Sequence, residues 1–205
     1  MPRVAKPKPA KTPVEPRRRD AAATRQAILN SARKAFAAHG YDGAGLREIA
    51  ANAGVTAMLV NRYFGSKEGL FEAAIDDAMS DASVIRKGMP DLDSLGAYLA
   101  AGVLETTRPD VTPLDGSLMM VRSGSTTNPR VIEIGRKQIE KMHLKTLAAA
   151  LGGDNAAERA ALILSLIAGV QVMRQMIHLT PLAKTSPATL QKLLAPVIQQ
   201  LADGA

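Results

Sequence analysis

The chain has 205 residues, of which 46% are hydrophobic, 3% are aromatic and none is cysteine. This composition supports a core of aliphatic side chains and methionine, excludes disulfides and thiol chemistry, and is typical of cytoplasmic proteins. The net charge of +7 favours a polyanionic partner. Helix-forming residues dominate and no stretch sustains the alternation of a strand, so the sequence predicts an all-α fold.

No segment has the pattern of a membrane span or a signal peptide. The longest apolar run, 160–170, is too short to cross a bilayer and is interrupted by Ser165. The basic N-terminus is not followed by the apolar segment of a secretory signal. We therefore expect a cytoplasmic protein without a membrane partner.

Residues 1–20 are basic and rich in proline. They contain seven Lys and Arg residues against two acidic residues, which is +5 of the total charge. Because they show no hydrophobic periodicity, we predict a disordered arm. Two interpretations stay open for it: contact with the phosphates or the minor groove of DNA, and a merely solubilising leader.

The first helix is expected from about residue 22 to residue 38. Gly40 would follow its C-terminus, since glycine adopts the left-handed backbone that ends many helices. Residues 41–45 would form a loop. The buried stripe of this helix would consist of Ile28, Ala32, Ala35 and Phe36.

Residues 46–67 predict two short helices joined by a tight turn. Leu46, Ile49 and Ala50 share one face of the first, and Gly54 ends it because a residue without Cβ tolerates a left-handed turn. Thr56 is a candidate N-cap for the second. Two helices at a sharp angle about a glycine form a helix-turn-helix, whose second helix fits the major groove of DNA.

The second of these helices would have a buried face and an outer face. Val60, Tyr63 and Phe64 recur at helical spacing and would pack against the rest of the motif. The side chains that would point away from the core are Ala57, Met58, Asn61 and Arg62.

A fourth helix should run from Ser66 to about Arg86, with Gly65 and Ser66 at its start. Lys67 then lies in the first turn, where its positive charge opposes the helix dipole. Such a lysine suggests an external anion such as a phosphate. The alternative is a solvated lysine, and the energies involved are too small to decide between them.

Residues 24–75 resemble the DNA-binding domain of TetR-family transcriptional regulators. The matching motifs are AFAAHGYDG, LREIAANAGV and YFGSKEGL, in the order and spacing of that family, over roughly a quarter of the chain. The resemblance implies a helical C-terminal domain that dimerises and usually binds a small molecule. We therefore expect an arm over 1–20, a DNA-binding domain over 21–66 and an effector-binding and dimerisation domain over 67–205.

The resemblance also implies roles for single positions. Arg47 corresponds to a residue that often reaches a base or a phosphate, Ala57 and Met58 to base-facing positions, and Tyr63 and Lys67 to phosphate contacts. The cap residue Thr56 and the outward-pointing Asn61 and Arg62 are added to these five. The predicted DNA-binding set is therefore Arg47, Thr56, Ala57, Met58, Asn61, Arg62, Tyr63 and Lys67.

Three positions depart from the family pattern. Gly45 stands where a capping Thr is usual, Leu59 where Thr or Ser is common, and Asn61 where Tyr is common. The loss of two hydroxyls weakens the usual phosphate clamp. Met58 and Leu59 offer apolar surface that could meet thymine methyl groups, although Leu59 could instead pack against the neighbouring helix.

Five more helices are expected after the fourth, about nine in all. Asp91 would cap the fifth, Asn155 and Glu158 would form a capping box for the eighth, and Pro196 would kink the ninth. The seventh would turn Ile139 and Met142 inward. The expected starts of the sixth, seventh and ninth helices are Thr112–Pro113, Asn128–Pro129 and Ser186–Pro187, and the expected end of the eighth is Thr180–Pro181.

The last two helices carry more apolar residues than one small domain covers. A second copy of the chain would cover them, in a four-helix interface with two-fold symmetry. The alternative is a monomer that buries them internally. We expect the homodimer because two copies are needed to read a palindrome.

Nothing in the sequence indicates catalysis, a metal site or a cofactor. His39, His143 and His178 show no metal-binding spacing, and neither a nucleophile motif nor a phosphate loop is present. An effector site could be lined by Met119, Met142, Met173, Arg174 and His178. For the methionines the simpler interpretation is core packing. Arg174 and His178 are four residues apart and would share a helix face, and the simpler interpretation for them is a solvated helix edge.

The sequence therefore predicts a dimeric repressor that a small, rather apolar effector releases from a palindromic DNA operator. Two alternatives stay open. One is an architectural DNA-binding protein without an effector, and the other is a protein-docking module that the helix-turn-helix anchors to DNA.

Overall fold

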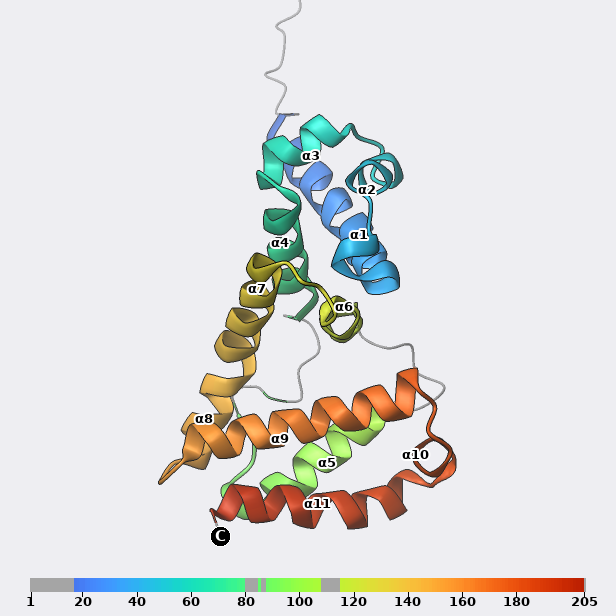
Figure 1. Ribbon diagram of the computed structural model, residues 1–205. Helices are drawn as coiled ribbons and strands as arrows, with labels where there is room; N and C mark the ends of the chain where they lie inside the picture. Colours follow the sequence, from blue (N-terminus) through green and yellow to red (C-terminus); the bar gives the residue numbers. More distant parts are fainter. Residues whose placement is uncertain (1–16, 80–84, 86–87, 108–114, 205) are drawn as a thin grey trace, which may run out of the picture.

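The computed structural model describes residues 17–79, 85, 88–107 and 115–204, and these form helices without any strand. The predicted all-α fold is confirmed. Figure 1 shows two stacked parts: α1 to α4 with α6 in the upper part, and α5 with α8 to α11 in the lower. Helix α7 runs from one part to the other.

The first helix, α1 (Arg17–Gly43), begins about five residues before the predicted start, so the end of the predicted arm is helical. Residues 1–16 of that arm lie outside the described residues. Gly40 interrupts α1 with a φ of +67°, as predicted. A Cβ at Gly40 would lie 2.5 Å from the carbonyl oxygen of Arg122 in α6. This close approach is a second reason why glycine is needed there.

The helix-turn-helix consists of α2 (Leu46–Asn52) and α3 (Ala57–Phe64). Gly54 has a φ of +70°, and Thr56 Oγ1 accepts a hydrogen bond of 3.3 Å from the backbone N–H of Leu59. Both features confirm the predicted turn and cap. Ser66 likewise caps α4 (Lys67–Met79) through the N–H of Gly69. The rest of the predicted fourth helix, beyond Met79, lies largely outside the described residues.

The larger hydrophobic core joins the helix-turn-helix to α6 (Asp115–Ser123) and α7 (Pro129–Ile139). The rings of Phe36, Tyr41 and Phe71 meet within it, with centroids 5.0 to 6.2 Å apart. Its members from the two later helices are Met119, Val131 and Ile134. The upper part therefore depends on residues far along the chain.

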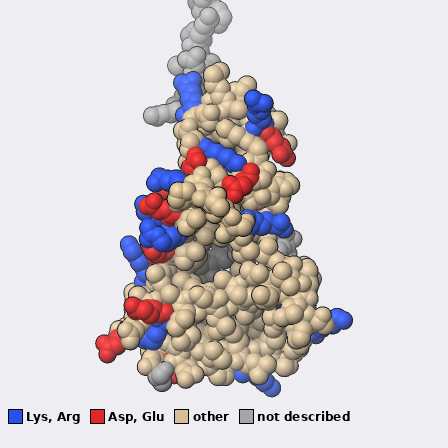
Figure 2. Space-filling view, in the orientation of Figure 1, with Lys and Arg blue, Asp and Glu red and all other residues tan. Residues whose placement is uncertain are grey.

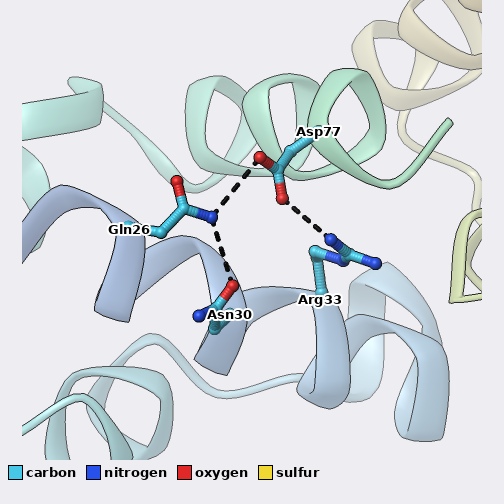
Figure 3. A network of polar contacts seen from close by, with 4 residues as sticks. All are labelled: Gln26, Asn30, Arg33 and Asp77. Atoms are coloured by element: carbon cyan, nitrogen blue, oxygen red, sulfur yellow. Dashed lines mark hydrogen bonds and ion pairs between the residues drawn. The ribbon is translucent and has the colours of Figure 1, made fainter. Parts of the chain in front are cut away.

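A polar network fastens α4 to α1 (Figure 3). Asp77 of α4 accepts from Arg33 Nη1 at 3.0 Å and from Gln26 Nε2 at 3.4 Å. Gln26 also donates to Asn30 at 3.2 Å. The Arg33 and Asp77 side chains are both about a quarter exposed, so their ion pair is less screened than a fully solvated one.

The second core lies in the lower part, among α5 (Leu95–Thr106), α8 (Lys145–Leu151), α9 (Ala156–Gln171) and α11 (Pro187–Asp203). A short 3₁₀ turn, η1 (Leu92–Ser94), leads into α5. The predicted cap by Asp91 is wrong: its side chain makes no capping bond, and its carbonyl oxygen instead accepts from Ser94. The predicted start of the sixth helix, at Thr112–Pro113, lies outside the described residues.

Helix α7 continues through a π-helical turn, η2 (Glu140–Leu144), into α8. Asn128 caps it as predicted, since its Oδ1 accepts from the N–H of Arg130 at 3.0 Å. The prediction that Ile139 points inward is wrong, because this side chain is 37% exposed. The buried stripe runs from Val131 to Gln138, and position 139 falls outside it at 100° per residue. Met142 is partly buried.

Helix α9 continues through a second π-helical turn, η3 (Val172–Met176). The predicted end at Thr180 is wrong: residues Thr180–Lys184 form a separate short helix, α10, which the sequence did not suggest. By length and composition alone, one helix among the described residues, Ala156–Met176, could cross a membrane, and 11% of its most apolar window is buried within the chain. The apolar run 160–170 is shorter than a membrane span, but the helix that contains it continues from Ala156 to Met176.

The start of α9 also differs from the prediction. Asn155 adopts a left-handed backbone and its side chain makes no capping bond, so the predicted capping box is absent. Arg159 of the first turn instead donates to the carbonyl oxygens of Gly152, at the end of α8, and of Asp154. It also reaches Leu201 and Ala202 at the end of α11 (Nη1–O distances 3.2 and 2.8 Å). The guanidinium of Arg159 thus donates hydrogen bonds to carbonyl groups at the C-terminal ends of both α8 and α11.

The last helix, α11, begins at the predicted cap, because Ser186 Oγ accepts from the N–H of Thr189. It continues through Pro196 to Asp203. Leu190 and Ile198 are buried, whereas Leu193 is 68% exposed.

We predict that Arg159→Ala lowers the free energy of unfolding by about 2 kcal/mol, because carbonyls at two helix ends lose a charged donor. Urea denaturation of the full chain measures this change. Arg136→Ala is the matched control, since Arg136 forms an exposed pair with Glu140 one helical turn away. It should change stability by less than about 0.5 kcal/mol. Equal effects of the two variants would contradict the role of Arg159.

Candidate nucleic-acid interface

The outer face of α3 carries most of the side chains that the sequence predicted there. Met58 is 80% exposed, and Asn61 and Arg62 are exposed as well. Val60, on the opposite face, is completely buried and fixes the helix to the larger core. Ala57 differs from the prediction because it is partly buried against that core. The helix therefore presents three exposed side chains from a base that is anchored in the core.

The neighbouring residues extend this surface. Arg47 lies exposed near the start of α2, and Leu59 is partly buried. Tyr63 is partly buried, with its ring beside that of Phe64 at 6.3 Å between centroids. Arg25 of α1 places its guanidinium over the Phe64 ring at 5.2 Å from the centroid. This second cation beside α3 was missed by sequence reasoning, because a contact across 39 residues leaves no local signal.

Lys67 is partly buried and has an aromatic partner. Its ammonium lies 4.6 Å from the centroid of the Tyr41 ring, a cation–π arrangement. Burial lowers the pKa of Lys67, while the nearby Asp42 and Glu68 act in the opposite direction. The sequence placed Tyr41 in a loop and gave no indication that its ring supports this lysine.

Tyr41 is also tied to the first turn of α4. Its hydroxyl donates to Glu68 Oε1 at 2.7 Å, and the Asn128 amide donates to the same oxygen at 3.4 Å. The bond from Tyr41 contributes most to lowering the pKa of the Glu68 carboxyl to about 2, followed by hydrogen bonds from the Glu68 backbone and from Ser66, whereas Asn128 contributes least. Burial, and then the Glu68 contact, raise the pKa of the Tyr41 hydroxyl far above its usual value. Glu68 is thus ionised and Tyr41 is neutral across the physiological range.

Charge is unevenly distributed over the surface. On the face in Figure 2, Lys, Arg, Asp and Glu side chains gather over the upper part and along one edge. The lower part, over α9 and α11, is largely uncharged. A charged end and an uncharged end suit partners of different chemistry.

The five residues predicted to line an effector site do not lie together. Met119 is buried in the larger core, whereas Met173 is exposed on η3. The prediction that Arg174 and His178 share a helix face is wrong, because the helix ends at Met176 and His178 follows with a φ of +54°. Sequence spacing suggested a shared face only because the helix was predicted to continue.

Arg174 is almost completely buried. It donates to the carbonyl oxygen of Leu104 at 2.6 Å, to Thr107 Oγ1 at 3.1 Å and to the carbonyl oxygen of Leu182 at 3.2 Å. These bonds close the end of α5 and hold α10. They give Arg174 a structural role in place of the predicted solvated edge.

One hollow of about 420 Å³ lies between α1 and α2. None of the five predicted effector residues lines it; its polar residues are Asn30, Ser31, Lys34, His39, Glu48 and Asn52. Among the residues that the structure describes, no group of three His, Cys, Asp or Glu could hold a metal ion.

Two family models match the chain. Residues 28–74 match the model described as "Bacterial regulatory proteins, tetR family", and residues 93–201 match "Tetracyclin repressor-like, C-terminal domain". A curated relative, the HTH-type transcriptional repressor AcnR of Corynebacterium glutamicum, is 43% identical over 63 residues. That alignment spans 30% of this chain and about a third, 34%, of the relative.

Solved structures resemble the chain over most of its length. A TetR-family regulator (SCO0857) from Streptomyces coelicolor shares 28% identity with a TM-score of 0.58, covering 91% of this chain and 98% of that one. AibR in complex with isovaleryl coenzyme A and operator DNA shares 14% identity with a TM-score of 0.60, covering 85% and 97%. This second likeness concerns the fold alone. Because the C-terminal family model by itself covers more than half of the chain, the chain belongs to the TetR family of bacterial transcriptional regulators.

Proposed function

We propose that the protein is a dimeric, sequence-specific repressor that a small, rather apolar effector releases from a palindromic operator. The observation that carries this proposal is the outer face of α3, where Met58, Asn61 and Arg62 project from a helix anchored by the buried Val60. The similarity to the repressor AcnR supports the same regulatory role.

In this proposal α3 enters the major groove. Asn61 and Arg62 would donate hydrogen bonds to base edges, and Met58 would contact thymine methyl groups. Arg47 of α2 and the partly buried Ala57 complete the base-reading set. Direct base contacts from these side chains would give sequence specificity.

Phosphate contacts would set the register on the duplex. We assign them to Thr56, Tyr63 and Lys67. The Thr56 oxygen accepts from the Leu59 N–H, which leaves the hydroxyl hydrogen available to a phosphate oxygen. Lys67 would present an ammonium that the Tyr41 ring holds at the start of α4.

A second copy of the chain would cover the uncharged lower end. Exposed apolar side chains of α9 and α11 support this arrangement, including Leu162, Leu193 and Val197. A two-fold dimer would place two copies of α3 in successive major grooves, ~34–36 Å apart.

We propose that residues 21–66 read DNA and residues 67–205 bind the effector and dimerise. We place the effector within this C-terminal domain. AibR, which shares the fold, was solved with isovaleryl coenzyme A and operator DNA. Of the predicted contacts, Met142, Met173 and His178 are accessible, whereas Met119 and Arg174 are buried in packed positions.

Selection of bound fragments from random DNA by the full chain, at physiological salt, tests the proposal. A recovered palindrome would support the dimeric regulator. Recovery of no motif, together with a steep dependence of affinity on salt, would favour an architectural DNA-binding protein instead.

We predict that Lys67→Ala weakens binding to every DNA sequence and lowers the slope of log affinity against log salt by about 1 per subunit, since one phosphate contact is lost. Titration of a fluorescent duplex at several salt concentrations measures the slope. Lys192→Ala, in the exposed part of α11 at the other end of the molecule, is the control and should leave it unchanged. A change in base preference would refute the phosphate assignment.

We predict that Arg47→Ala relaxes the preference at one position of each half-site, at a cost of about 1–3 kcal/mol for the preferred base. Repeating the fragment selection with the variant measures this. An unchanged preference would remove Arg47 from the base-reading set.

We predict that Leu193→Lys converts the dimer to a monomer, because a charge would be buried in the apolar interface. Sedimentation velocity measures the assembly. Ile132→Lys is the matched control, since Ile132 is also well exposed, at 55%, but lies on α7. Dissociation by the Ile132 variant alone would place the interface elsewhere.

A further inference from the structure

Tyr41 is the point where α6 meets the lysine at the start of α4. Its backbone N–H donates a hydrogen bond of 3.0 Å to the Oγ of Ser123, which is the last residue of α6. Its hydroxyl donates to Glu68, and its ring lies under the ammonium of Lys67. The same tyrosine therefore contacts the C-terminal part of the chain on one side and a proposed phosphate ligand on the other.

Asn128 brings the start of α7 to the same place. Its Oδ1 accepts from the N–H of Arg130 and caps α7, while its Nδ2 donates to Glu68. Glu68 thus accepts from both Tyr41 and Asn128 through one oxygen, Oε1. A shift of the α7 N-terminus would change the acceptor that orients Tyr41.

Tyr41 has little freedom to move independently of these contacts. It is buried, and its ring packs between Phe36 and Phe71 at 6.2 and 5.4 Å between centroids. Ser123 is buried as well, and the preceding carbonyl of Arg122 lies against Gly40. Packed contacts of this kind transmit a displacement because close-packed interiors have few voids to absorb it.

We propose that Ser123 and Asn128 are positioning residues that set where Lys67 presents its ammonium to a DNA phosphate, acting through Tyr41 and Glu68. The inference rests on the proposed function, since it assumes the phosphate contact of Lys67. It adds a route by which α6 and α7 alter DNA affinity directly at the start of α4 (Figure 1). An effector would change DNA affinity by this route because it would bind one arrangement of α6 and α7 better than another.

Three variants separate this role from simple stabilisation. Tyr41→Phe keeps the ring beneath Lys67 and removes the hydroxyl that binds Glu68. Asn128→Ser keeps a good helix cap and removes the amide donor. Asn128→Asp also keeps the cap but places a second carboxylate beside Glu68, which repels it.

Each variant is tested alone and with Lys67→Ala, using the full chain and a mixed-sequence duplex of about 30 base pairs, because phosphate contacts do not depend on sequence. We expect Tyr41→Phe and Asn128→Ser to weaken binding about threefold to tenfold and to lower the salt slope towards that of Lys67→Ala. In the Lys67→Ala background they should have no further effect. Asn128→Asp should weaken binding more than Asn128→Ser.

Ser186→Ala is the control for a purely structural effect, because it removes the cap of α11 at the other end of the molecule. It should lower the melting temperature and leave the salt slope unchanged. The positioning role is refuted if Tyr41→Phe and Asn128→Ser likewise lower the melting temperature and leave the salt slope unchanged. It is also refuted if their effects on binding add to that of Lys67→Ala. In both cases the phosphate contact of Lys67 stands. If Lys67→Ala itself leaves the slope unchanged, the phosphate assignment fails and the positioning role fails with it.

Discussion

The packing of Phe71 against Phe36 and Tyr41 holds the upper part of the molecule together, with both pairs of rings meeting edge to face. A helix-turn-helix of this size buries too little apolar surface to be stable alone. Its core is completed by Met119 of α6 and by Val131 and Ile134 of α7. The orientation of α3 towards any partner therefore depends on helices that follow it by more than fifty residues.

In the lower part, two arginines organise the ends of helices. Arg159 closes α8 and α11, and Arg174 closes α5 and holds α10. Helix C-termini present unsatisfied carbonyl groups with partial negative charge, which a guanidinium neutralises with several donors at once. Because the ends are fixed internally, α9 and α11 are free to present apolar side chains outward without losing their arrangement.

The two ends of the molecule thus have different surface chemistry. Long polar and apolar side chains project from α3 beside charged neighbours, whereas the face over α9 and α11 is largely uncharged. Tyr41 lies at the junction with α6 and α7, where its hydrogen bonds to Ser123 and Glu68 and its ring contact with Lys67 bring these residues into one cluster. The same side chains that stabilise this junction also position the cation that we assign to a phosphate.

The sequence by itself determined the local features: the all-α fold, the turn at Gly54, the caps Thr56, Asn128 and Ser186, and the exposed Met58, Asn61 and Arg62. Each depends on backbone preference or on neighbours within one helical turn, which the pattern of residues displays.

Only the tertiary structure decided the rest. Ile139 is exposed, the caps predicted at Asp91 and Asn155 are absent, and Arg174 is buried among helix ends, because each outcome depends on where other helices lie. The contacts of Tyr41 with Lys67, Glu68 and Ser123 likewise join residues up to 82 positions apart. No local pattern encodes such contacts, since packing between distant helices brings those side chains together.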